Sequence, residues 1–213
     1  NVQWKKPVNA PQRMKLKVSE IFYSLQGEGA RAGTPTVFIR LQGCKTKNAC
    51  YAMGIKCDTE FESGKEIEVT ELVAWMRQNA PGCKEITWTG GEPLDQLKSE
   101  HTAFFKAQGY FQALETSGLV APPAGFDFIC VSPKVAEHVV KKNFQNGVTE
   151  LRYVRHFGQN IPEPAITAEH YWISPHSDGN AINDKNLKHC IELCLQHPKW
   201  KLSVQQHKVW SVL

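Results

Sequence analysis

The sequence predicts an α/β protein with a largely parallel sheet, open or curled toward a barrel. Short apolar or β-branched runs of strand length recur at residues 36–41, 85–89, 110–114, 126–131, 151–154, 171–173 and 202–204. Between some of these runs, apolar residues recur at helical spacing, in 69–76 and again in 187–195. Strands that alternate with helices are typical of parallel sheets, so we expect this architecture.

Composition favours an ordinary globular protein. The chain has 213 residues, of which 41% are hydrophobic and 22% charged, and no repeat or linker interrupts it. We therefore expect one domain over residues 14–213, preceded by an N-terminal extension over 1–13 that is a candidate for disorder. Three basic residues and no acid lie in that extension, so the rest of the chain contributes only +1 to the net charge of +4. Nucleic acid is accordingly not an expected partner.

Apolar stretches are too short for a membrane helix, and the N-terminus lacks the apolar segment of a signal peptide. The sequence therefore predicts a cytoplasmic protein with no membrane partner.

Polar motifs follow several of the predicted strands directly. They are Gly43-Cys44, Gly90-Gly91-Glu92-Pro93, Glu115-Thr116-Ser117-Gly118 and Ser132-Pro133-Lys134. In parallel α/β folds ligands bind at the carboxyl ends of the strands, so these motifs predict the functional site.

Three cysteines, Cys44, Cys50 and Cys57, lie within fourteen residues in a lysine-containing loop whose positive charge favours thiolates. Three thiolates suit an iron-sulfur cubane with one iron left free, whereas structural zinc normally takes a fourth ligand. Ordinary loop thiols remain an alternative. Cys190 and Cys194 lie on the apolar stripe of a predicted helix, which favours core packing, and Cys83 and Cys130 have no metal-site context.

The TGGEP segment at 89–93 predicts a ligand-binding turn. Gly90-Gly91 would let a ligand approach the backbone closely, and the Glu92 carboxylate would accept a hydrogen bond from an ammonium group such as that of a methionine moiety. A plain turn is the alternative explanation.

Seven short segments of the chain and their order carry a resemblance to a known family. They are EIFYSLQGEG (20–29), FIRLQGC (38–44), CDTEF (57–61), TGGEP (89–93), ETSG (115–118), SPK (132–134) and QQHK (205–208). In this order, from about Val18 to the end, the chain resembles the 7-carboxy-7-deazaguanine synthase family of radical S-adenosylmethionine (SAM) enzymes. The resemblance implies a single-domain partial (β/α) barrel.

The cysteine spacing departs from that family's pattern. Relatives usually show C-x3-C-x2-C, whereas the interval between Cys44 and Cys57 is longer by six residues, and Gly54 stands where the middle cysteine would be. Cys50 must then be the middle ligand. A longer loop can fold back at modest entropic cost.

The resemblance also implies the chemistry. In that family a reduced [4Fe-4S] cluster transfers one electron to SAM, and the resulting radical starts the ring contraction of 6-carboxy-5,6,7,8-tetrahydropterin. The product is 7-carboxy-7-deazaguanine, formed with loss of ammonia, and it feeds queuosine and 7-deazapurine biosynthesis. No catalytic side chain is implied beyond the cluster and the cofactor.

Matching motifs imply the contacts of each ligand. SAM contacts are implied for Lys56, Cys57, Asp58, Gly91, Glu92, Ser117, Ser132, Pro133, Lys134, Ile173, Ser174 and Pro175, although relatives often carry Gln where Ser174 stands. Substrate contacts are implied for Leu25, Gln26, Gly27, Glu28, Arg40, Thr89, His207 and Leu213, with Arg40 as the natural carboxylate partner. Thr59 aligns with a Mg²⁺ ligand. As plainer alternatives, Arg40 makes a surface ion pair, His207 is an interior histidine and Thr59 is a turn residue.

Two other functions remain open at this point. An activase of the glycyl-radical type would share the cysteines and GGEP without needing LQGEG or SPK. A non-enzymatic zinc module would use the three loop cysteines and a histidine. For the preferred function, the resemblance implies an electron donor such as flavodoxin or ferredoxin, and a homodimer.

Overall fold

The computed structural model describes residues 14–52, 61–177, 179 and 181–212. Its strands are β1 (Lys15–Leu25), β2 (Pro35–Leu41), β3 (Lys65–Glu68), β4 (Glu85–Gly90), β5 (Phe111–Thr116), β6 (Phe128–Val131), β7 (Val148–Arg155), β8 (Ala168–Pro175) and β9 (Lys201–Leu202). Its helices are α1 (Lys47–Ala52), α2 (Val69–Asn79), α3 (Ser99–Ala107), α4 (Glu137–Lys141), α5 (Asp184–Gln196) and α6 (Gln206–Trp210), with 3-10 turns η1 (Gly29–Arg31) and η2 (Pro93–Asp95).

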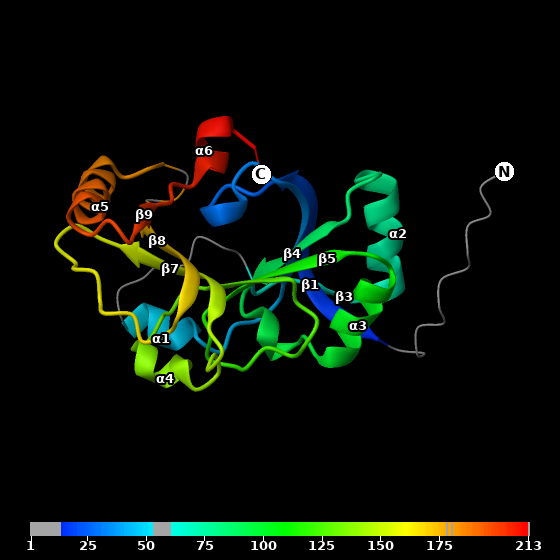
Figure 1. Cartoon of the computed structure of the whole chain (residues 1–213). Helices are drawn as coiled ribbons and strands as arrows, with labels where there is room; N and C mark the ends of the chain where they lie inside the picture. The colour runs from blue at the N-terminus through cyan, green and yellow to red at the C-terminus, as the bar shows by residue number, and fades with distance from the viewer. Residues whose placement is uncertain (1–13, 53–60, 178, 180, 213) are drawn as a thin grey trace.

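All nine strands form one sheet in the order β3-β1-β2-β4-β5-β6-β7-β8-β9 (Figure 1). From β2 through β4 to β9 each strand is parallel to the next one in this order, whereas β1 runs antiparallel to both of its neighbours, β2 and β3. The first and last strands of this order do not pair among the described residues, so the sheet is open. The predicted α/β class with a partial barrel is confirmed.

Every strand predicted from an apolar run is present, and β1 and β3 are additions. β1 begins with alternating charged and apolar side chains, KLKV, and β3, KEIE, has a single apolar residue. Such strands lie at the margin of a sheet with one face in solvent, so they lack a continuous apolar run.

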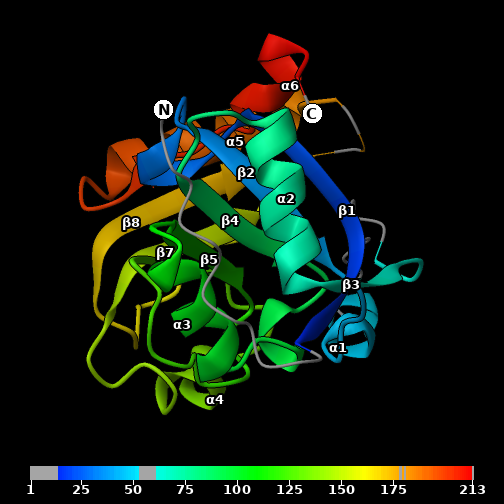
Figure 2. The same cartoon turned by 90° about the vertical axis from the view of Figure 1, so that its right-hand side faces the viewer.

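The hydrophobic core lies between the sheet and its helices. Figure 2 shows α2 and α3 lying over the strands on one side of the molecule, where Trp88 of β4 meets Phe105 of α3 at 5.0 Å between ring centroids. A second cluster packs β6, β7 and β8 against α4 and α5. Since alternate residues of a strand face opposite sides, the other face is left for the polar residues of the same strands.

The two helices expected from periodicity are confirmed as α2 and α5. In α2 the buried residues are the predicted ones. In α5, however, the buried residues are Asn186, Cys190 and Leu193, and Leu195 is 78% exposed. The predicted stripe is therefore partly wrong, because α5 covers only the end of the sheet and buries a narrow strip. None of the described helices is long and apolar enough to cross a membrane.

Candidate active site

The cysteine loop starts where β2 ends. Cys44 follows β2 directly, and Cys50 lies in α1, where its N–H donates to Thr46 at 3.1 Å. The N–H of Gly43 donates to the carbonyl of Phe61 at 2.8 Å, so the two ends of the long loop meet. The longer interval between the cysteines thus contains the helix α1, and the residues that flank it, Gly43 and Phe61, are hydrogen-bonded to each other.

Four predicted site residues of this loop, Lys56, Cys57, Asp58 and Thr59, lie outside the described residues, as does Leu213 at the C-terminus. Within the described part of the chain, no group of three or more His, Cys, Asp or Glu side chains is arranged to hold a metal ion. The predicted cluster ligands Cys44 and Cys50 are both partly buried.

The GGEP turn packs directly against the start of the cysteine loop. Gly91 donates to the carbonyl of Leu41 and Glu92 to that of Gly43, both at 2.9 Å. A Cβ on Gly91 would lie 1.9 Å from the carbonyl oxygen of Gly43. The space on the Cβ side of this glycine is therefore filled by protein backbone, and a SAM contact of the Gly91 backbone stays a prediction.

The carboxylate of Glu92 is 2% exposed and bound by protein donors. One oxygen accepts from the N–H of Leu94 at 3.3 Å and the hydroxyl of Thr116 at 2.6 Å. The other accepts from the N–H of Ser117 at 2.9 Å and from its hydroxyl. Since a carboxylate has about four acceptor positions, these four bonds occupy it. Glu92 therefore joins the ends of β4 and β5, in place of the ammonium contact expected from the sequence.

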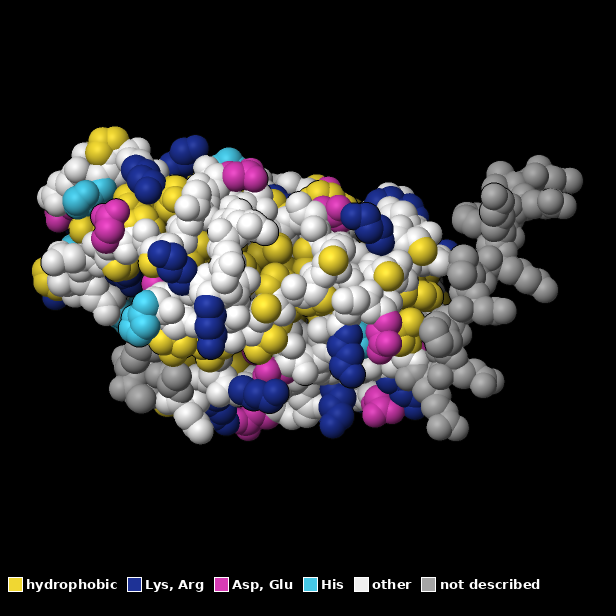
Figure 3. Space-filling model, turned by 60° about the horizontal axis from the view of Figure 1, so that its bottom comes forward, with side chains coloured by type: hydrophobic (Ala, Val, Ile, Leu, Met, Phe, Trp, Pro, Cys, Tyr) yellow, Lys and Arg dark blue, Asp and Glu magenta, His cyan; other side chains and the backbone are white. Residues whose placement is uncertain are grey.

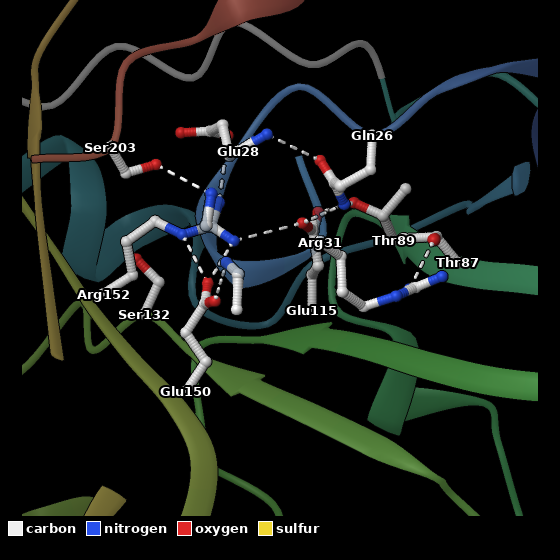
Figure 4. Close-up of polar contacts among 12 residues, drawn as sticks. Gln26, Glu28, Arg31, Thr87, Thr89, Glu115, Ser132, Glu150, Arg152 and Ser203 are labelled. Atoms are coloured by element: carbon white, nitrogen blue, oxygen red, sulfur yellow. Dashed lines mark hydrogen bonds and ion pairs between the residues drawn. The ribbon is translucent and has the colours of Figure 1, made fainter. Parts of the chain in front are cut away.

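Residues from three distant motifs meet at Glu115 of β5, on the face of the sheet opposite the helices (Figure 4). Gln26 donates to one oxygen of Glu115 at 3.2 Å and Thr89 to the other at 3.1 Å. The backbone N–H of Glu28 donates to the side-chain oxygen of Gln26 at 3.1 Å. The structure thus brings together the predicted substrate residues Gln26, Glu28 and Thr89.

A buried arginine, Arg152 of β7, lies at the centre of the same face. Its guanidinium contacts Glu150 at 2.6 Å, Glu28 at 3.0 Å and Glu115 at 3.6 Å. Figure 4 shows these carboxylates reaching it from different directions. Our sequence prediction missed both Arg152 and Glu150. The alternation in ELRYVR, with Leu151 and Tyr153 facing the core, could have indicated that they face the other side.

Charges in this cluster stabilise one another. Burial would raise the pKa of Glu150, but the Arg152 charge and the N–H of Ala30 outweigh it, so that pKa lies below 4.5. Burial would lower the pKa of Arg152, yet the surrounding carboxylates raise it well above its ordinary value. Burial raises the pKa of Cys130 well above 9.0, so Cys130 stays a neutral thiol.

Arg40 lies on the same face as Thr89, its partner in the β2 to β4 register. It forms an ion pair with Glu20 at 2.8 Å and stacks on the ring of Phe22 at 4.9 Å. The plainer prediction of an ion pair is thus confirmed, and a substrate contact of Arg40 stays a prediction.

His207 of α6 closes over the LQGEG segment. The N–H of Gln206 donates to the carbonyl of Gly27 at 2.9 Å, and a Cβ on Gly27 would lie 2.1 Å from Nδ1 of His207. The C-terminal helix and the end of β1 are therefore held together, with predicted substrate residues on both.

Other predicted SAM residues follow β5 and β6 directly or form the last three positions of β8. Ser117 is bonded to Glu92, and Lys134 donates to the hydroxyl of Ser132 at 2.9 Å. Ser174 is 1% exposed, and its hydroxyl has no hydrogen-bond partner in the structure. Ile173 is fully buried in the hydrophobic core, so its side chain faces away from Ser174. Ser174 and Lys134 thus offer polar groups at the carboxyl ends of their strands, which fits a polar cofactor.

A groove of about 800 Å³ also borders Cys44. Its other lining residues come from both ends of the cysteine loop, from the β1 and β3 margin and from the region of η2 and α3, and none belongs to the Arg152 cluster. The cysteine loop can therefore be approached from a second side.

No protein-family model matches the chain. The 7-carboxy-7-deazaguanine synthase of Caulobacter vibrioides is 36% identical over 211 residues, covering 92% of this chain and 98% of the relative. That of Bordetella pertussis is 36% identical over 213 residues, with the same coverage.

The crystal structure of QueE from Escherichia coli aligns with a TM-score of 0.66 and covers 90% of this chain and 94% of that one, at 22% identity. This similarity shows a shared fold. The sequence identities of 36% over nearly the whole chain, together with this shared fold, show that the chain belongs to the 7-carboxy-7-deazaguanine synthase family of enzymes.

Proposed function

We propose that the protein converts 6-carboxy-5,6,7,8-tetrahydropterin to 7-carboxy-7-deazaguanine with loss of ammonia, as a lyase of queuosine and 7-deazapurine biosynthesis. The observation that carries this proposal is the meeting of Gln26, Glu28 and Thr89 at Glu115. Gln26 and Glu28 belong to the LQGEG segment, Thr89 to TGGEP and Glu115 to ETSG. Together they form one polar surface at the end of the sheet that also carries Cys44.

The substrate would bind on this polar surface. A pterin ring presents both N–H donors and ring acceptors along one edge, which amide and carboxylate side chains complement. Glu115, which our sequence prediction did not include, adds acceptors there. The remaining substrate contacts are proposed for Leu25, Gly27, His207 and Leu213, with Arg40 facing the substrate carboxylate.

The cofactors would bind beside this surface. Cys44, Cys50 and Cys57 are the three thiolates for a [4Fe-4S] cluster, and a soft-metal cluster suits such donors. SAM would contact Lys56, Asp58, Gly91, Ser132 to Lys134 and the Ser174 hydroxyl. The bound cluster and SAM supply the radical chemistry. The chain's own residues would bind and orient the substrate.

Magnesium, the electron donor and the oligomeric state complete the proposal. Thr59 and the substrate carboxylate would supply oxygen ligands to Mg²⁺, which usually keeps waters as well. A flavodoxin or ferredoxin would approach the side of the cysteine loop. Figure 3 shows Lys and Arg side chains interspersed with Asp and Glu over the face at the bottom of Figure 1, and the basic groups among them would pair with acidic groups of the partner. A homodimer and a cytoplasmic location complete the expected setting.

Anaerobic turnover tests the proposal directly. Reconstituted protein is incubated with SAM, 6-carboxy-5,6,7,8-tetrahydropterin and a strong reductant, and products are identified by mass spectrometry. We expect 7-carboxy-7-deazaguanine in an amount that exceeds the enzyme. SAM cleavage without deazaguanine would favour the activase, and a colourless protein containing zinc would favour the binding module, since iron-sulfur clusters absorb visible light.

A further inference from the structure

We propose that Arg152 is a positioning residue for substrate binding: its guanidinium pairs with the carboxylates of Glu28 and Glu115 and orients them so that both accept hydrogen bonds from the substrate's N–H edge. The inference rests on the proposed function, and none of the family motifs noted above includes Arg152. It assigns this arginine a role in recognition through the carboxylates that it contacts.

Geometry gives Arg152 contacts with three separate parts of the fold. Nε and Nη2 both bond to Glu150 of the same strand, at 3.0 and 2.6 Å. Nη1 reaches Glu28 after β1 at 3.0 Å, and Nη2 lies 3.6 Å from Glu115 on β5. The rigid guanidinium plane therefore fixes the relative placement of Glu28 and Glu115, which a single point charge could not do.

Glu150 in turn anchors the loop that carries Glu28. Its second oxygen accepts from the N–H of Ala30 at 2.8 Å. Gly29, at φ +66°, leaves the room for this carboxylate, because a Cβ there would lie 2.3 Å from it. The N–H of Gly29 donates to the hydroxyl of Ser203 after β9 at 2.9 Å. The position of Glu28 thus depends on the Arg152 to Glu150 pair.

Charge balance explains why recognition depends on the arginine. The side chains of Glu28, Glu115, Glu150 and Arg152 are 16%, 27%, 1% and 8% exposed, so solvent screens them weakly. One cation faces three carboxylates, which leaves a net negative surface for N–H donors. Other titratable groups facing the cluster from neighbouring elements are Cys130 on β6, His170 opposite Glu150 on β8, and His207 against Gly27.

Without the arginine, three clustered carboxylates would share a proton near neutral pH. A protonated carboxyl has lost acceptor capacity for the substrate's N–H groups, so binding would require that proton to leave. Substrate affinity of an arginine-free variant should consequently fall as the pH is lowered. A purely structural arginine would instead lower stability, with an affinity loss that is equal at every pH.

The experiment compares Arg152→Gln, Arg152→Lys and the unaltered protein, each with cluster and SAM bound. Anaerobic calorimetry measures affinity for 6-carboxy-5,6,7,8-tetrahydropterin between about pH 6 and 8, in two buffers of different ionisation enthalpy. The buffer difference reports the protons released on binding. Because all proteins share one substrate, its own protonation cancels in the comparison.

We expect Arg152→Gln to bind substrate about 10-fold or more weakly at pH 8. If one proton must be released on binding, the substrate affinity of this variant should fall further below pH 8, by at most about tenfold per pH unit. Arg152→Lys keeps the positive charge and should release no extra proton, but it should still lose several-fold in affinity because the forked contacts are gone. SAM affinity should stay unchanged in both variants.

Arg31 supplies the matched control. It is also a poorly exposed arginine, at 11%, in an ion pair with Glu85 of the same sheet, and it contacts none of the three carboxylates in Figure 4. Arg31→Gln should lower stability without changing the pH dependence of substrate binding. If Arg152→Gln does not fold, Arg152→Lys tests the proposal alone. A loss of substrate affinity with unchanged SAM affinity in that variant would support the positioning role.

An affinity loss that is equal at all pH values, with no extra proton released by Arg152→Gln, would overturn the positioning role. Substrate affinity unchanged in Arg152→Lys would do so as well. In both cases turnover by the unaltered protein leaves the proposed function standing. If the unaltered protein fails to bind the carboxypterin, the proposed function falls and this inference falls with it.

Discussion

Gly27 and His207 lie in direct contact although they stand near opposite ends of the chain. A Cβ on Gly27 would lie 2.1 Å from Nδ1 of the imidazole and 2.9 Å from the backbone nitrogen of His207. Only a glycine therefore permits α6 to close over the LQGEG segment as it does. The contact places the imidazole beside the proposed substrate surface.

Gly27→Ala should weaken substrate binding. The added methyl group would displace the His207 ring, and loss of one polar substrate contact lowers affinity roughly tenfold. Anaerobic calorimetry with the carboxypterin measures the effect. Gly33→Ala is the control, because its Cβ would meet no atom within 4 Å. At φ +85° that control should cost roughly 1 to 2 kcal/mol of stability and leave affinity unchanged. Equal substrate affinity in Gly27→Ala, Gly33→Ala and the unaltered protein would show that the contact between Gly27 and His207 plays no part in substrate binding.

Glu92→Gln should destabilise the protein even without any ligand. An amide group replaces one carboxylate oxygen and faces two of the four donors, which leaves buried donors without acceptors at a cost of about 2 kcal/mol or more. Urea unfolding of the apoprotein measures this. Glu100→Gln, on the exposed surface of α3, should change stability by no more than about 0.5 kcal/mol. If Glu92 served only to bind the SAM ammonium, apoprotein stability would be unaffected.

The cysteines should separate into two groups. Cys44→Ala, Cys50→Ala and Cys57→Ala should each abolish the four-iron cluster, whereas Cys190→Ala and Cys194→Ala should retain it. Cys190 is fully buried, and burial raises its pKa to about 12, so it is a core thiol at neutral pH. Iron and sulfide analysis after anaerobic reconstitution provides the measurement. A full cluster in Cys50→Ala would show that Cys50 is not the middle ligand.

Arg40→Ala should weaken substrate binding by about 10-fold to 150-fold, because this is the affinity that a hydrogen bond between charged groups typically contributes. SAM cleavage in the absence of substrate should change little, and turnover should depend on Mg²⁺ if Thr59 is its ligand. Glu20→Gln is the control, since it removes the ion-pair partner of Arg40 and keeps the guanidinium. Unchanged substrate affinity in Arg40→Ala would leave the arginine with its ion pair alone and argue for another substrate.

Stability should fall in acid partly through Glu150. Its pKa is lower in the folded protein than the ordinary 4.5. Its contribution is therefore fully present above about pH 4.5 and is lost as the pH falls through the lower folded value. Urea unfolding between about pH 3 and 6 should show a shallower pH dependence in Glu150→Gln than in the unaltered protein. If the free energy of unfolding depended on pH equally in both proteins, the Glu150 carboxylate would not contribute to the loss of stability in acid.

Much of the fold could be predicted from the sequence because the buried strands of a parallel sheet are continuous apolar runs. The strands at the sheet margin could not, since β1 and β3 carry charged, exposed residues between their apolar ones and so have no continuous apolar run. The helix stripe of 187–195 was partly wrong for a related reason. Periodicity gives the spacing of a face but not how much of it the sheet covers.

The sequence by itself determined the family, through short motifs in a fixed order, and the parallel architecture that places those motifs at one end of a sheet. Only the tertiary structure decided which partners the polar side chains take. Glu92 bonds to Thr116 and Ser117 on the next strand, and Arg152 meets Glu28 and Glu115. Such contacts depend on strand register and on loops that close over long distances along the chain, and no local pattern of residues specifies them.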